Sequence, residues 1–170
     1  MSRELGLTCM SFALSLLAIQ PLAGQATTPS SLPGSWQLTL TPVSPTASVP
    51  VRVSALATFT SDGSVVETDA TEVTPTLNTA GTTVRGTPGH GIWQSGPAFG
   101  TLFIQFISLL VNQNETLHAK KIVTITGSLD STSNHLKGSY SYELVDPAGV
   151  VMATGSGTVT GQRIPHPLLP

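Results

Sequence analysis

Apolar and polar side chains alternate along most of this chain, and beyond the first residues no stretch has the apolar spacing of a helix. In the first such run, Trp36, Leu38 and Leu40 fall on one face, and Gln37 and Thr39 fall on the other. Strict alternation is typical of half-buried β-strands. Eight runs of this kind, bounded by turn residues, lie at 35–40, 51–60, 64–70, 92–94, 101–111, 116–129, 136–145 and 150–164.

The segments between these runs are mostly short and rich in turn residues, so we expect successive strands to pair in antiparallel fashion. Asp62-Gly63 predicts a tight hairpin between two of the runs. Charged residues make up only 9% of the chain, which leaves few charges to protect an exposed sheet edge. Closing the sheet removes its edges. We therefore predict an all-β fold, an antiparallel up-and-down barrel of about eight strands, with a β-sandwich as the alternative.

The N-terminus has the pattern of a secretory signal peptide. Arg3 precedes an apolar run that ends at Ile19, and Pro21 and small residues up to Ala26 follow. The run is short for a membrane-spanning helix, so we expect cleavage near Ala26, no stable membrane insertion afterwards, and a secreted or periplasmic protein. The expected organisation is a signal peptide at 1–26, a flexible linker at 27–33, the barrel domain at 34–164 and a Pro-rich tail at 165–170.

Several classes of site are excluded by composition. Cys9, the only cysteine, lies in the predicted signal, so the exported chain would have no thiol chemistry. Only seven residues are basic, and the adjacent pair Lys120-Lys121 would face opposite ways on a strand, which argues against a nucleic-acid partner. The histidines have no metal-ligand spacing. We expect neither a metal site nor a cofactor.

The segment Gly34-Ser35-Trp36 together with Arg163 resembles the calycins, the group that contains the lipocalins. In that family an arginine of the last strand lies across the tryptophan of the first strand and helps to close one barrel end. The resemblance therefore implies that Gly34, Trp36 and Arg163 close this barrel. The segment Pro88–Trp93 is similar to one in uncharacterised exported bacterial lipocalin-like proteins, and a further relative is the allene oxide cyclase type of barrel.

The segment 71–90 is rich in Thr, Pro and Gly, and we predict that it is a long loop of the kind that often has a function. His90 ends it. One hypothesis places His90 at the barrel mouth, where it contacts a ligand or moves a proton. The other, which we favour, is structural, with Gly89 and Gly91 providing positive φ around it.

Polar residues among the strands are candidates for orienting a ligand within an apolar interior. The candidate ligand-binding residues are Gln105, Lys121, Tyr140, Tyr142, His90 and Trp93. Their alternative is a packed core in which the tyrosine hydroxyls are satisfied at the rim. The small residues Ala153, Gly155 and Gly157 would leave space for a ligand. Glu67 and Asp69 share one strand face, which we expect to be the solvated outer face.

Three functions fit these features. The first is a barrel that binds a small, largely apolar ligand. The second is a cofactor-free isomerase or cyclase that transfers a proton through His90 or a tyrosine. The third is a structural or interaction module of the cell envelope.

Overall fold

The computed structural model describes residues 32–43, 52–70, 76–77, 83–98 and 100–165. The predicted signal peptide, most of the linker, and residues 166–170 of the tail lie outside these ranges. Within them, no helix is long and apolar enough to span a membrane. The strands are β1 (Gly34–Pro42), β2 (Val53–Phe59), β3 (Ser64–Asp69), β4 (Thr76–Leu77), β5 (Thr83–Gly86), β6 (Gly89–Ser95), β7 (Thr101–Asn112), β8 (Leu117–Leu129), β9 (His135–Val145) and β10 (Val151–Arg163).

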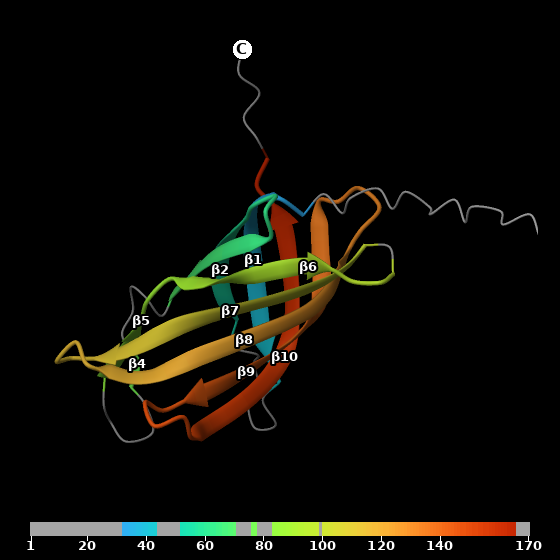
Figure 1. Cartoon of the computed structure of the whole chain (residues 1–170). Coiled ribbons are helices and arrows are strands. Elements are labelled where there is room, and N and C mark those ends of the chain that lie inside the picture. Colours follow the sequence, from blue (N-terminus) through green and yellow to red (C-terminus); the bar gives the residue numbers. More distant parts are fainter. Residues whose placement is uncertain (1–31, 44–51, 71–75, 78–82, 99, 166–170) are drawn as a thin grey trace, which may run out of the picture.

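Eight of the strands form a closed antiparallel ring (Figure 1). The order around it is β1-β2-β3-β6-β7-β8-β9-β10, and β10 pairs back with β1. Pairing between β7 and β8 completes the ring, so each of these strands has a neighbour on both sides. The predicted all-β barrel is confirmed. Closure uses the backbone groups that an open sheet would expose at its edges.

The predicted loop at 71–90 is partly wrong, because β4, β5 and the first residues of β6 lie in it. Strand β5 pairs with the far end of β7, beyond the part that pairs with β6. Gly86 at the end of β5 is opposite Leu110, and His90 of β6 is opposite Ile107, so four residue steps between them match three along β7. This extra residue is a bulge. Thr87 lies within it and bonds to Leu109 through both its backbone N–H and its side-chain oxygen.

The predicted hairpin between β2 and β3 is present, with a three-residue loop from Ser61 to Gly63. The Thr60 N–H donates to the Ser64 carbonyl at 3.0 Å, and Gly63 has a φ of 91°. Such a loop needs a residue with positive φ, which glycine provides without steric cost. The loop length sets Phe59 opposite Val65, and both side chains are buried.

The interior is filled at the end where β1 begins and β10 ends. Trp36 is fully buried, is opposite Arg163 on β10, and donates its indole N–H to the Leu32 carbonyl at 2.9 Å. The Arg163 guanidinium lies 4.6 Å from the centre of the Trp36 ring and donates to the carbonyls of Pro33 and Ser133. These contacts make this end of the barrel the closed one.

Candidate functional site

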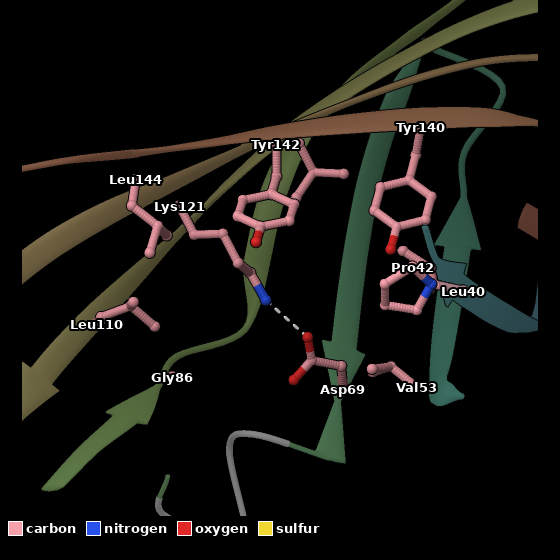
Figure 2. Close-up of a pocket in the computed structure, with 11 residues that line it drawn as sticks. Leu40, Pro42, Val53, Asp69, Gly86, Leu110, Lys121, Tyr140, Tyr142 and Leu144 are labelled. Carbon is pink, nitrogen blue, oxygen red and sulfur yellow. Dashed lines mark hydrogen bonds and ion pairs between the residues drawn. The ribbon is translucent and has the colours of Figure 1, made fainter. Parts of the chain in front are cut away.

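A cavity of about 350 Å³ lies at the other end of the barrel, where β1, β3, β5, β7 and β9 end (Figure 2). Its volume is at the lower end of the range for small-molecule pockets. The lining is mostly apolar and comes from six strands of the ring, β1, β2, β3, β7, β8 and β9, and from β5. The lining residues are Leu40, Pro42, Val53, Asp69, Gly86, Leu110, Lys121, Val123, Tyr140, Tyr142 and Leu144.

The two tyrosines form one wall of the cavity. Tyr140 is opposite Gly157 and Tyr142 is opposite Gly155 across β9 and β10. A Cβ at Gly155 would lie 2.4 Å from the Tyr142 ring, and one at Gly157 would lie 2.7 Å from the Tyr140 ring. The rings therefore occupy the places that side chains on β10 would fill, an arrangement by which aromatic residues cover strand glycines.

The prediction that the small residues of β10 leave the empty space of the cavity is therefore wrong. Gly155 and Gly157 face inward, but tyrosine rings cover them, and Ala153 is exposed. The cavity lies on the other side of the rings. In Figure 2 both tyrosines extend from β9 with their hydroxyls directed into the cavity.

One ion pair lies in the cavity. Lys121 Nζ on β8 is 2.7 Å from Asp69 Oδ2 at the end of β3, and the side chains are 17% and 8% exposed. Two strands, β6 and β7, separate β3 from β8 in the ring, so the ion pair bridges part of the interior. The remainder of the lining offers the tyrosine hydroxyls and apolar carbon.

The hydroxyl of Tyr140 stays protonated over the physiological range. Burial raises the pKa of Tyr140 above its ordinary value, and the nearby Tyr142 raises it further. A protonated phenol both donates and accepts hydrogen bonds. Tyr140 is therefore suited to orient a polar group by hydrogen bonding. It is a weaker acid than an ordinary tyrosine, and it does not act as a base at neutral pH.

The sequence pattern did not predict Asp69 as a cavity residue, because the face of β3 that was expected to point outward is its inner face. Glu67 is opposite Ala57 and is 2% exposed, and Asp69 continues the same face into the cavity. The prediction that Glu67 and Asp69 are solvated is wrong. A three-residue hairpin loop places Glu67 opposite Ala57 and Asp69 opposite Ala55, and both alanines were already expected to point inward.

A buried polar layer lies below the cavity, along β3, β6 and β7. A Cβ on Gly89 would come within 3.0 Å of Glu67 Oε2 and 3.1 Å of the Ser108 hydroxyl oxygen. Both side chains are buried, and they use the room that glycine leaves. Ser108 is opposite Lys121 across β7 and β8, so this layer continues into the ion pair.

Two of the predicted site residues lie on the outer surface instead. His90 is exposed on β6, opposite Val66 and Ile107, and not at the barrel mouth. Gln105 is exposed on β7 and donates to the Thr124 hydroxyl oxygen at 3.3 Å. The strands continue through both positions, and alternation turns these side chains outward. The predictions that they reach the interior are wrong.

The glycines beside His90 also have a different role from the one expected, because neither has positive φ. A Cβ at Gly91 would lie 1.9 Å from the Gln105 carbonyl oxygen and 2.5 Å from the Phe106 Cα. The segment around His90 is thus a strand packed tightly against β7, which supports the structural hypothesis in a different form.

The remaining predicted residues divide between the two barrel ends. Lys121, Tyr140 and Tyr142 line the cavity. Trp93 packs against the core near the Ser61–Gly63 loop, and its indole N–H donates to the Thr60 carbonyl at 2.9 Å. It therefore belongs to the closed end. In the part of the chain that the structure describes, no three His, Cys, Asp or Glu side chains are grouped as metal ligands.

Comparisons with family models, with curated proteins and with solved structures found no match for this chain.

Proposed function

We propose that this protein is an exported, lipocalin-like barrel that binds a small, largely apolar ligand in the cavity beside Tyr140, Tyr142 and the Lys121–Asp69 ion pair. The observation that carries the proposal is the cavity itself, about 350 Å³ in volume and lined mainly by apolar side chains with a few convergent polar groups. That combination is typical of ligand pockets.

Further support comes from the arrangement of the two barrel ends. The closed end is filled by Trp36 under Arg163, which is the arrangement that the calycin resemblance implies. Polar groups gather in the cavity at the opposite end. Export rests on the charged, apolar and small-residue pattern of residues 1–26.

The cofactor-free isomerase hypothesis loses His90, whose side chain is exposed on the outside of β6. The tyrosines remain as its proton donors, and the raised pKa of Tyr140 disfavours its use as a base at neutral pH. Binding requires only the geometry and the polarity of the cavity, so it is the function that we propose.

Titration with N-phenylnaphthylamine, an uncharged apolar fluorophore, tests the proposal. We expect saturable binding at one site per chain, with a blue-shifted emission because the probe enters apolar surroundings. Linear, non-saturating uptake would overturn the proposal.

The cavity can be filled by Leu110→Trp, since Leu110 of β7 lines it. We expect the Kd of N-phenylnaphthylamine to rise by about tenfold or more, because the indole takes up volume that the probe needs. The matched control is Leu109→Trp, where the side chain is 40% exposed on the outer face of the same strand. The same loss of affinity in both variants would place the probe elsewhere.

A further inference from the structure

The charges of the cavity cancel. Lys121 provides one ammonium and Asp69 one carboxylate, 2.7 Å apart and largely removed from solvent. Among the described lining residues these two are the only Lys, Arg, Asp or Glu side chains. Both tyrosine hydroxyls also face the cavity, and Glu67 lies one step deeper on β3. The apolar walls come from β1, β2, β7, β8 and β9.

A charged ligand head has no free counterion in such a cavity. A carboxylate that approaches Lys121 also approaches Asp69. An ammonium that approaches Asp69 meets Lys121. In either case, opposing charges offset much of the attraction, while the ligand still loses its hydration.

A ligand whose polar head is an uncharged oxygen avoids the cost of removing a net charge from water. Lys121 has three N–H donors, and among the described residues Asp69 accepts from one of them, so others are left for an acceptor. The Tyr142 hydroxyl, which Figure 2 shows directed into the same cavity, offers a further donor or acceptor. A hydroxyl or carbonyl oxygen on an apolar body thus finds hydrogen bonds without the transfer of a net charge out of water.

We propose, on the basis of the proposed binding function, that the cavity selects uncharged ligands with an acceptor oxygen over acids and amines, and that the Lys121–Asp69 pair sets this selectivity. Removing one partner takes away one of the two opposing charges of the pair and inverts the preference. Asp69→Asn creates a site for an acid, and Lys121→Met creates a site for an amine.

The test is displacement of bound N-phenylnaphthylamine by decanol, decanoate and decylamine, which share one chain length and differ in the head. For the unmodified protein at neutral pH, we expect decanol to bind tightest, by about tenfold over either charged compound. With Asp69→Asn we expect decanoate to gain about tenfold relative to decanol, and with Lys121→Met we expect decylamine to gain similarly.

Two controls distinguish the effect of charges in the cavity from the effect of the net charge of the protein. The double variant Lys121→Met/Asp69→Asn restores neutrality and should rank decanol first again. Lys120→Met removes a positive charge from the outer face of the same strand and should leave the ranking unchanged.

The inference is overturned if decanoate or decylamine binds the unmodified protein more tightly than decanol. It is also overturned if well-folded single variants keep the original ranking, with folding checked by far-UV circular dichroism. Should a single variant fail to fold, the ranking by the unmodified protein decides. Absence of saturable probe binding counts against the proposed function instead, so the two failures are distinguishable.

Discussion

Trp36→Ala is expected to lower the free energy of unfolding by about 3–5 kcal/mol, the usual cost of truncating a buried aromatic residue to alanine. The side chain is 0% exposed, so its removal leaves a void between β1 and the residues around it. It also leaves the Leu32 carbonyl without its indole donor and the Arg163 guanidinium without the ring beneath it. Urea unfolding followed by far-UV circular dichroism measures the change.

Two companion variants make this result specific to the closed end. Trp36→Phe keeps an aromatic ring, so it loses only the hydrogen bond and part of the packing. It should therefore lower the free energy of unfolding by less than the alanine variant. Gln37→Ala changes the exposed neighbour on β1 and should stay within about 0.5 kcal/mol of the unmodified protein. A Trp36→Ala loss as small as that of Gln37→Ala would contradict the closed-end packing described above.

Gly91→Ala is the second substitution with a large expected effect, although it adds a single methyl group. That methyl would lie 1.9 Å from the Gln105 carbonyl oxygen, which is part of the β7 backbone and cannot rotate away. Strands β6 and β7 must separate locally, and we expect a loss of about 3 kcal/mol, the upper part of the usual range for overpacking. Thermal and urea unfolding would both report the loss.

His90→Ala is the matched control for this position. His90 precedes Gly91 on β6 and its side chain is exposed, so we expect a change within about 0.5 kcal/mol. It should also leave the affinity for N-phenylnaphthylamine unchanged, since the side chain lies outside the barrel. If Gly91→Ala is as mild as His90→Ala, then β6 does not pack against β7 as closely as the distances indicate.

The closed end and the cavity differ in how their side chains pack. Around Trp36, close packing fills the interior and supplies stability. Around Tyr142, the glycines of β10 let aromatic rings lie flat against the strand, which keeps room in front of the rings. A barrel of this size can be filled or hollow, and here one end is filled and the other hollow.

The sequence predicted the strands well where apolar residues alternate without interruption. Strands β8, β9 and β10 were expected at 116–129, 136–145 and 150–164, close to their observed bounds. It failed between 71 and 90, where short strands rich in Thr and Gly have no sustained apolar period. Strands β5 and β6 exist because β7 offers backbone partners to them, and this information lies in another part of the chain.

The candidate site was half predicted, and the reason is the register at one hairpin. Asp62-Gly63 indicated a turn but not whether the loop has two residues or three. A shift of one residue moves every side chain of a strand to the other face of the sheet. With the observed loop, Glu67 and Asp69 point inward, and Asp69 meets Lys121.

The sequence alone thus determined that the chain forms antiparallel strands, because period-two alternation is a local property. Closure into a barrel was predicted with a β-sandwich as the alternative, and the pairing of β10 with β1 decided between them. The sequence also identified Lys121, Tyr140 and Tyr142, since polar residues stand out on otherwise apolar faces. Only the tertiary structure decided which end of the barrel is hollow and which charges meet there. Those facts depend on the pairing of strands far apart in the sequence, and no local pattern encodes that register.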